Sequence, residues 1–247
     1  MLTLFCLLTF CAHNKVRRRC TLDLSVVGNF CFRIGFLQSL FSVNSLEEPT
    51  HWDNNTQSQI QIGTFDIVVT NPPFGSRTPV DVQRILHQYE ITNFGSLNPR
   101  NSLPPEQLFV ERCLDFLRPD GYLGIVLPDS ILSNPGLTWL REWIFKKAYI
   151  IASIDLPQET FEPHTGTQTS ILILKKKSNQ EVRTNEDYSI FMAIPGKVGH
   201  DKRGNPVYKT TPDGEIEIDE KGDKMIDDHL RFISTLFIQW AKDKGMI

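Results

Sequence analysis

The 247-residue chain lacks an apolar run of the eighteen or so residues that are needed to cross a bilayer. Its first twelve residues, MLTLFCLLTFCA, imitate the apolar part of an export signal. The positive cluster from Lys15 to Arg19 follows this stretch, whereas an export signal carries its positive charge in front. We therefore expect no membrane association and no secretion.

The chain also lacks an excess of positive charge. It has 26 Lys and Arg against 29 Asp and Glu, which gives a net charge of -3. A protein that coats nucleic acid without regard to sequence is strongly basic, so this balance excludes that class. Any contact with DNA must be local. With 40% apolar residues, the chain has enough hydrophobic side chains to build a sizeable core.

Cysteine pairs with metal-binding spacing are missing as well. Four of the five cysteines lie in the first 31 residues without forming a C-x-x-C pair: Cys6, Cys11, Cys20 and Cys31. His13 is the only histidine near them, so we predict no metal site. Asp23 is the only acidic residue of residues 1–42. Two explanations of this atypical segment stay open: a small unusual N-terminal segment, or residues read in a frame or from a start that does not belong with the rest.

Beyond about Phe41, short apolar runs alternate with helical patterns, which is typical of an α/β fold with a parallel sheet. The first clear strand is expected at Thr64–Thr70 (TFDIVVT) and is halted by Pro72 and Pro73. In open α/β sheets, ligands bind beyond the carboxyl ends of the strands. The residues from Asn71 onward are therefore the expected place for chemistry.

Further elements follow from periodicity and turn residues. A long loop, either functional or disordered, is expected over 76–105 with one short helix at 82–89, followed by a helix at 106–117 that Pro119-Asp120-Gly121 ends. A buried strand at 121–128, apolar on both faces, precedes a helix at 136–147 and strands at 149–156 and 170–176. No helix separates the last two strands, which favours an antiparallel pair. Past Lys177 we expect an exposed appendage with a hairpin and an amphipathic helix at 227–245, and we find no internal repeat.

Asn71-Pro72-Pro73-Phe74 is the most informative string of the chain. Asn and Pro also favour a simple strand-ending turn, which is the plainer reading. The functional reading rests on chemistry: an exocyclic amine conjugated with a ring must be held by hydrogen-bond acceptors before it can attack a methyl donor. The side-chain carbonyl of Asn71 and the backbone carbonyl of Pro72 are such acceptors, and Phe74 offers a flat face for an extruded base.

At these residues the chain resembles the adenine-specific N6 DNA methyltransferases, in particular the modification subunit of type I restriction-modification systems. The resemblance covers about residues 42–235 and rests on Phe65–Gly75, Gly121–Leu132 and Ile150–Lys177, with Val198–Asn205 adding to it. It implies an S-adenosylmethionine-dependent methyltransferase sheet whose last strand is antiparallel. It also implies that Asn71 and Pro72 bind the target amine and that Phe74 stacks on a flipped adenine. The implied partners are double-stranded DNA and a specificity subunit, with a restriction subunit as a further candidate, in the cytoplasm.

The chain departs from this family upstream of the motif. The family places a glycine-rich loop and then an acidic residue there for the cofactor, whereas Gly28 and Gly35 form no G-x-G. Asn44, in FSVNSLEEP, is the residue that would contact the cofactor adenine. We therefore predict three regions: the atypical residues 1–42, the distal part of a methyltransferase domain at 43–178, and a C-terminal hairpin and helix at 179–247 for contact with a partner or DNA.

Three functions stay open. The first is methyl transfer to N6 of adenine, and the second is a non-catalytic, truncated remnant that binds DNA or a partner at most. The third is methylation of protein glutamine, for which a similar motif usually ends in Tyr; Phe74 argues against it. Secondary candidates for polar or DNA contacts are Asp129, Asp155, His164 and the run Lys175–Lys177, each with a plain structural alternative.

Overall fold

A computed structural model describes residues 4–7, 43–74, 79–178 and 187–246. These residues fall into two compact units. The first holds 4–7, 43–74, 79–153, 171–178 and 187–190, and the second holds 154–170 and 191–246. The predicted division at residues 42 and 178 stays a prediction, as does the origin of residues 1–42, most of which lie outside the described part.

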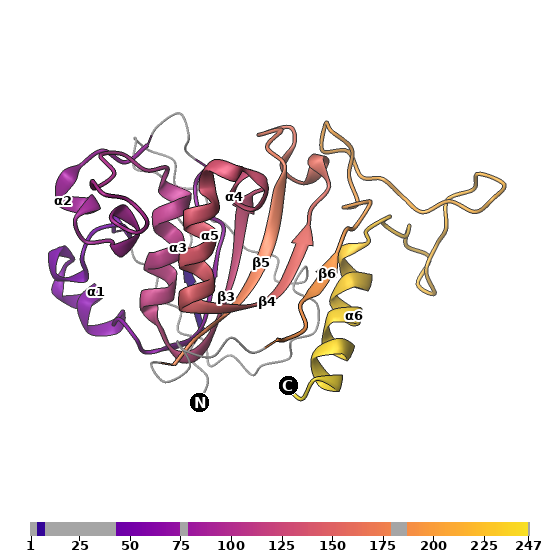
Figure 1. The fold of residues 1–247 in the computed structure, drawn as a ribbon. Coiled ribbons are helices and arrows are strands. Elements are labelled where there is room, and N and C mark those ends of the chain that lie inside the picture. Colours follow the sequence, from indigo (N-terminus) through magenta and orange to yellow (C-terminus); the bar gives the residue numbers. More distant parts are fainter. Residues whose placement is uncertain (1–3, 8–42, 75–78, 179–186, 247) are drawn as a thin grey trace. The chain divides into compact units, whose positions relative to one another are not determined.

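A mixed sheet forms the centre of the first unit (Figure 1). Its strands follow the order β1-β2-β3-β5-β4, with the bounds β1 Leu4–Leu7, β2 Phe65–Thr70, β3 Leu117–Pro128, β4 Ala148–Asp155 and β5 Thr169–Lys176. The first three strands are parallel, and Thr70 of β2 lies beside Leu7 of β1 and Ile125 of β3. The expected α/β sheet is confirmed.

The predicted reversal of the last strand is also confirmed. The amide of Leu156, after β4, donates to the carbonyl of Thr169 at 2.9 Å. At the other end of the pair, the amide of Lys177 donates to the carbonyl of Lys147 at 2.9 Å. The end of each strand therefore meets the start of the other, so β4 and β5 are antiparallel, and β5 lies between β3 and β4.

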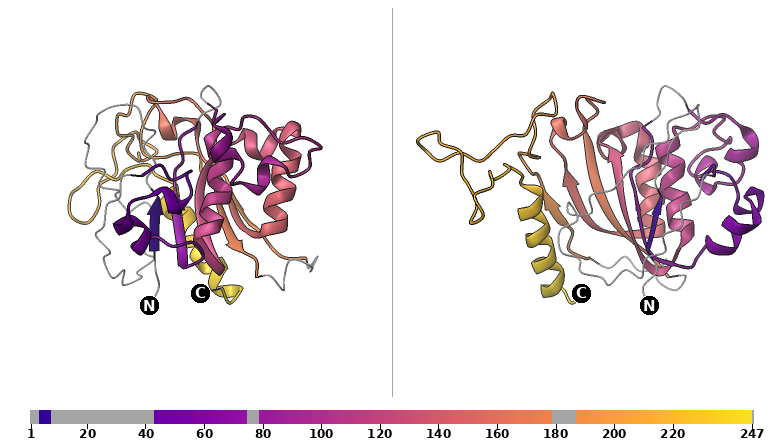
Figure 2. Two further views of the ribbon diagram at one scale, coloured as in Figure 1. Left: turned by 90° about the vertical axis from the view of Figure 1, so that its left-hand side faces the viewer. Right: turned by 180° about the vertical axis from the view of Figure 1, so that it is seen from behind.

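Helices cover one face of this sheet, and the two longest of the unit, α3 and α5, lie on the same side of it (Figures 1 and 2). The helical segments of the first unit are α1 Asn54–Gln59, α2 Gln83–Leu86, α3 Pro105–Phe116, α4 Ser130–Ser133 and α5 Thr138–Lys147, with short 3-10 turns η2 Pro49–His51, η3 Glu90–Thr92 and η4 Pro135–Leu137. Nearly every residue of α3 is buried, so this helix is surrounded rather than amphipathic. Leu108 and Phe109 of α3 join Leu140 and Trp143 of α5 in one hydrophobic core.

The junction between α3 and β3 differs from the prediction. Pro119-Asp120-Gly121 was expected to end the helix, but the helix ends at Phe116 and the strand begins at Leu117. The extra residues form a bulge against β2, with Asp120 at φ +64°. A Cβ on Gly121 would lie 3.0 Å from the carbonyl oxygen of Asp66, a tight contact that glycine avoids at this close approach of the two strands. Over 121–127 of β3, alternate residues are buried and half-buried, so the strand predicted to be buried and apolar on both faces is more deeply buried on one of them.

The second unit contains η5 Gln158–Phe161, β6 Phe191–Ala193 and α6 Leu230–Asp243. The predicted apolar stripe of the C-terminal helix is confirmed in its packing: Phe237 and Trp240 contact the ring of Phe191, with centroids 5.4 and 5.7 Å apart. Between β6 and α6, residues 198–228 form what we call the three-turn module. The hairpin predicted in this region is only part of the arrangement, because three turns of the same kind, each flanked by an antiparallel bridge, close this module.

The three turns end at Gly204, Gly214 and Gly222, each with φ between +81° and +88°. Each glycine amide donates back to the carbonyl of the residue three positions earlier, at 2.9 to 3.0 Å. Backbone hydrogen bonds of 2.9 Å then link Lys209, Glu217 and Met225 in a closed triangle. These positions are eight residues apart, so the module has a structural repeat, and each of its turns begins with Asp or Thr and has Gly at its fourth position.

No helix within the described residues is long and apolar enough to cross a membrane.

Candidate active site

The Asn71–Phe74 motif leaves the sheet directly after β2, at the edge where parallel strands β1, β2 and β3 end. Thr70, the last residue of β2, is only 4% exposed. Asn71 is then exposed, Pro72 is buried, and Pro73 and Phe74 are half-buried. Two consecutive prolines cannot continue the β-ladder, so the chain turns out of the sheet here. Residues 75–78 lie outside the described part.

Within the motif, the Asn71 side chain is the polar group that is exposed. The side chain of Asn71 makes no hydrogen bond to any other residue that the structure describes. A proline has no N–H, so the backbone of Pro72 carries a hydrogen-bond acceptor, its carbonyl, and no donor. The arrangement offers two acceptors and one aromatic ring at the carboxyl edge of a parallel sheet, where ligands of α/β proteins bind.

Asn44 lies in an exposed turn before β2. Its side-chain oxygen accepts a hydrogen bond from the amide of Leu46 at 3.2 Å, and its backbone carbonyl accepts from Nε1 of Trp52 at 3.1 Å. Both Asn44 oxygens are therefore engaged within the turn, while the residue itself is exposed.

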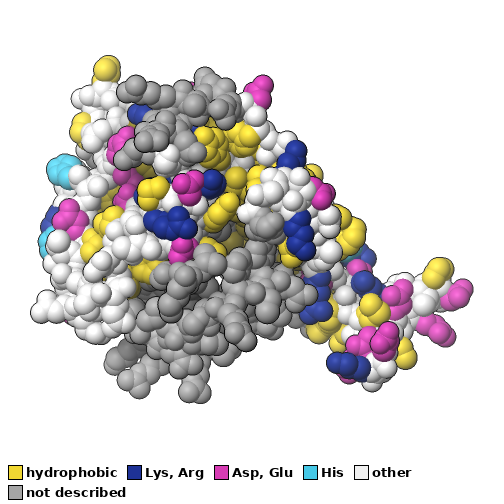
Figure 3. Space-filling view, turned by 90° about the horizontal axis from the view of Figure 1, so that it is seen from below, with side chains coloured by type: hydrophobic (Ala, Val, Ile, Leu, Met, Phe, Trp, Pro, Cys, Tyr) yellow, Lys and Arg dark blue, Asp and Glu magenta, His cyan; other side chains and the backbone are white. Residues whose placement is uncertain are grey.

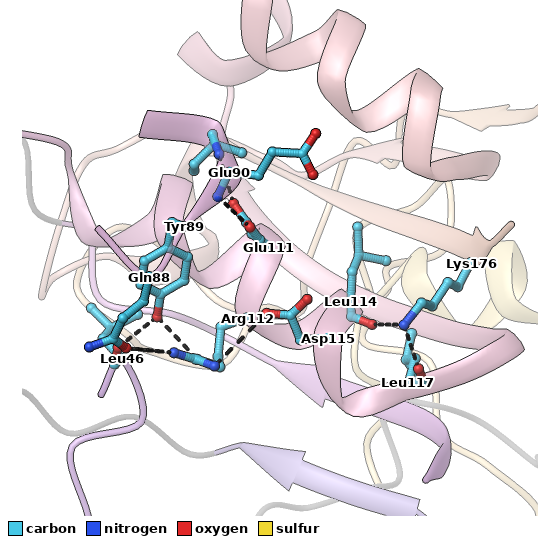
Figure 4. Close-up of polar contacts among 11 residues, drawn as sticks. Leu46, Gln88, Tyr89, Glu90, Glu111, Arg112, Leu114, Asp115, Leu117 and Lys176 are labelled. Atoms are coloured by element: carbon cyan, nitrogen blue, oxygen red, sulfur yellow. Dashed lines mark hydrogen bonds and ion pairs between the residues drawn. The ribbon is translucent and has the colours of Figure 1, made fainter. Parts of the chain in front are cut away.

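A buried polar cluster on α3, which the sequence did not predict, holds the segments on either side of β2 (Figure 4). Glu111 and Arg112 are 6% and 3% exposed. The Glu111 carboxylate accepts the amides of Glu90 and Ile91 at 2.7 and 2.9 Å. We call Glu111 and Arg112 with their partners the α3 brace. Its signal in the sequence is weak, because Glu106, Gln107 and Asp115 are polar or charged residues of the same helix.

Arg112 forms the second half of the α3 brace. Its Nε donates to the hydroxyl of Tyr89 at 3.1 Å, and its Nη2 donates to the carbonyl of Leu46 and to Oε1 of Gln88, each at 3.2 Å. Nη1 of the same guanidinium lies 3.8 Å from Oδ2 of Asp115. The Tyr89 hydroxyl donates to the same Leu46 carbonyl at 2.8 Å.

Burial changes the acidity of this cluster. It raises the pKa of Glu111 to about 7, although the two backbone amides oppose the shift by stabilising the carboxylate. Burial also raises the pKa of Asp115, against the attraction of Arg112, and that of the Tyr89 hydroxyl. These pKa shifts are caused by burial within the folded protein and do not require a bound substrate.

The long loop predicted after the motif is ordered over residues 79–104. Nη1 of Arg100 donates to the carbonyls of Ile91 and Phe94 at 2.9 and 2.8 Å. Its guanidinium lies 3.5 Å from the ring centroid of Trp139, which is a cation–π contact. With Glu111, these contacts account for the order of a segment with little regular structure, so of the two predicted alternatives disorder is wrong.

The secondary candidates have structural roles. Asp129 follows β3, and its backbone carbonyl begins α4 by accepting from Leu132 and Ser133. In the second unit, Asp155 accepts from Nε2 of Gln168 at 2.9 Å, and the amide of His164 closes a turn with Phe161.

The three consecutive lysines are likewise engaged within the protein. Lys175 pairs with Asp120 at 2.8 Å. Lys176 donates to the carbonyls of Leu114 and Leu117, and Lys177 donates to that of Phe145. These partners lie at the end of α3, the start of β3 and the end of α5, so the lysines mark the edge opposite to the Asn71–Phe74 motif.

Charges of both signs are interspersed on the face drawn in Figure 3. Lys and Arg side chains form no continuous patch on the described part of that face.

Comparison with known proteins places this geometry in a family. A family model described as N-6 DNA methylase matches residues 38–211. The methylase subunit of the type I restriction enzyme EcoEI from Escherichia coli is 27% identical over 136 residues, which are 54% of this chain and 24% of that protein. Defense against restriction protein B of Escherichia phage P1 is 31% identical over 115 residues, 46% of this chain and 4% of that protein.

Among solved structures, the methyltransferase subunit of a type I restriction-modification system from Streptococcus thermophilus is 22% identical, with a TM-score of 0.47 over 80% of this chain and 35% of that chain. The chain spans about a quarter or less of the length of the EcoEI subunit and of the phage protein. The family model covers well over half of the chain and includes the Asn71–Phe74 motif, so the chain belongs to the N-6 DNA methylase family, whose adenine-modifying members serve restriction-modification systems.

Proposed function

We propose that this chain is part of an enzyme that transfers a methyl group from S-adenosylmethionine to N6 of a flipped adenine in double-stranded DNA. The observation that carries the proposal is the Asn71–Phe74 motif, which leaves the carboxyl end of a parallel strand with the Asn71 side chain exposed. We propose a specificity subunit, which selects the DNA sequence, as a protein partner of the chain, and a restriction subunit as a further candidate. The proposed location is the cytoplasm.

Each residue of the motif has one task. The side-chain oxygen of Asn71 and the carbonyl of Pro72 accept the two hydrogens of the adenine amine, which localises its lone pair for attack. Pro73 makes the turn rigid, and the half-buried ring of Phe74 stacks on the extruded base. No strong general base is required, because the amine becomes cationic on methylation and then loses its proton readily.

The described residues fit one part of the cofactor. The exposed turn at Asn44 presents an amide donor to the ring nitrogens of the cofactor adenine. When bound, the cofactor supplies the methyl group. No glycine-rich G-x-G string precedes the motif in the sequence, and the methionine part has no evident holder among the residues the structure describes.

That missing string favours a second candidate function, a non-catalytic remnant that binds DNA or a partner at most. The two candidates differ in cofactor binding. An active methylase must bind S-adenosylmethionine with its own residues or together with a partner, whereas a remnant has no such requirement.

The experiment is to titrate the full chain with S-adenosylmethionine by calorimetry and then to assay N6-methyladenine in DNA by mass spectrometry. We expect saturable binding and methylation, and loss of methylation in Asn71→Ala. Asn98→Ala, at an exposed position of the 79–104 loop, is the matched control and should leave methylation unchanged. Absence of cofactor binding would favour the remnant, and undiminished methylation in Asn71→Ala would refute the assigned role.

A further inference from the structure

One guanidinium joins the two segments that flank β2 along the chain (Figure 4). Arg112 contacts Leu46, two residues beyond Asn44, through the Leu46 carbonyl. It also contacts the side chains of Gln88 and Tyr89, which belong to the segment that follows the Asn71–Phe74 motif. The Asn44 turn, which is expected to face the cofactor, and the segment after the motif, which is expected to lead away from the target base, therefore both contact the buried guanidinium of Arg112.

The turn at Asn44 is held from both directions. On one side, the indole of Trp52 donates to the Asn44 carbonyl at 3.1 Å. On the other, the Leu46 carbonyl accepts from the Tyr89 hydroxyl at 2.8 Å and from Arg112 at 3.2 Å. Since the Asn44 side chain is exposed while its backbone is fixed, its direction is set by these buried partners.

We propose that Arg112 is a positioning residue that fixes the Asn44 turn against the segment following the motif, so that the cofactor and the target base are bound in register. This inference rests on the proposed function, since it assigns the turn to cofactor binding. Arg112 itself touches neither ligand in this scheme and acts through Leu46 and Tyr89.

The geometry requires arginine at this position. The planar guanidinium serves the Tyr89 hydroxyl, the Leu46 carbonyl and Gln88 at the same time, and it lies 4.9 Å from the Tyr89 ring centroid. A lysine ammonium keeps the charge but presents its donors from a single nitrogen, so it cannot reach all three partners. Loss of the fork leaves buried acceptors unpaired, which costs more than an exposed contact would.

The test compares the two halves of the α3 brace in the full chain. Arg112→Lys disturbs the side that holds the Asn44 turn, whereas Glu111→Gln disturbs the side that holds Glu90 and Ile91. Tyr89→Phe removes one hydroxyl and keeps the ring, and it serves if Arg112→Lys does not fold. The measurements are the Kd for S-adenosylmethionine and, by NMR, the shift and hydrogen exchange of the Trp52 indole N–H.

We expect Arg112→Lys to weaken cofactor binding about tenfold or more, and Tyr89→Phe about threefold, as for the loss of charged and neutral hydrogen bonds respectively. Both should shift the Trp52 indole signal. Glu111→Gln should accelerate hydrogen exchange of the Glu90 and Ile91 amides. It should leave the Kd for S-adenosylmethionine and the exchange rate of the Trp52 indole N–H within about twofold of the parent values, well below the tenfold change expected for Arg112→Lys.

Two results would overturn the proposal: an unchanged Kd in both Arg112→Lys and Tyr89→Phe, or an equal loss of binding in Glu111→Gln, which would indicate general destabilisation. If the parent chain binds no cofactor, the proposed function fails separately. The indole signal then decides: an unchanged signal in Arg112→Lys contradicts the positioning role, and a shifted signal supports it.

Discussion

The two segments that flank residues 75–78 treat their polar groups in opposite ways. At the Asn71–Phe74 motif, Asn71 is exposed and its side chain finds no described partner. In the 79–104 loop, Glu111 and Arg100 bind backbone amides and carbonyls, and Arg112 binds the side chains of Gln88 and Tyr89. A polar group without a hydrogen bond at a sheet edge is available to bind a ligand. A polar group that is hydrogen-bonded to a buried charged side chain stabilises the fold.

The largest effect is expected where the structural segment is broken. Glu111→Ala strands two buried amides and removes charged hydrogen bonds, so the free energy of unfolding should fall by about 4 kcal/mol. Urea denaturation measures it. Glu142→Ala, on the exposed side of α5, is the control and should change stability by no more than about 0.5 kcal/mol. A loss as small as that of the control would mean that the loop is held by other contacts.

The same carboxylate should make stability depend on pH. In the folded state the pKa of Glu111 is raised to about 7 from an ordinary 4.5, so between these values the folded chain binds more protons than the unfolded chain. Its contribution to stability is therefore full below about pH 4.5 and is lost as pH rises to about 7, by roughly 3 kcal/mol.

Urea denaturation across this pH range measures the slope, and Glu111→Gln should flatten it. Burial also raises the pKa of Asp115, which adds a slope of the same sign that persists in the variant. An identical pH dependence in Glu111→Gln and the parent would assign the slope to other groups.

At the motif, the effect should appear in ligand binding. Phe74→Ala removes a stacking face that is worth about 2 kcal/mol per base, so binding of an extruded base should weaken roughly thirtyfold. Fluorescence of 2-aminopurine in a mismatched pair of a short duplex reports extrusion, which a mismatch facilitates. Phe232→Ala, at a position 64% exposed on α6, is the control. Equal fluorescence for both variants would remove Phe74 from base recognition.

The smallest effect is expected in a comparison of two asparagines, Asn71 and Asn134. Asn71→Ala should change the free energy of unfolding by less than about 0.5 kcal/mol, because the side chain supports nothing in the described fold. Asn134→Ala should cost about 1 kcal/mol, because the Asn134 side chain accepts the Gly136 amide at 2.8 Å and caps η4. Thermal unfolding compares them. A larger loss for Asn71 than for Asn134 would show that the motif is structural.

Much of the fold was predictable from local pattern. Strand β2 is a continuous apolar run stopped by two prolines, and β4 and β5 are too closely connected for a crossover helix, so their bounds and antiparallel pairing follow from period and turn residues. The bulge at Gly121 was not predictable, because Pro-Asp-Gly is equally suited to end a helix, and only the approach of Asp66 selects the strand. The equivalence of the three turns was not predicted, although each begins with Asp or Thr and has Gly at its fourth position; the backbone hydrogen bonds show that they close in the same way.

The sequence by itself determined the α/β alternation, the motif and its place after a buried strand, because these depend on neighbouring residues and on the periods of strand and helix. Only the tertiary structure decided which charged residues are buried. Glu111 and Arg112 read as ordinary helix residues, and their roles arise from Leu46, Tyr89 and Glu90, partners 20 or more residues away. A buried charge is tolerated only where distant segments satisfy it, and that condition is a property of the folded chain.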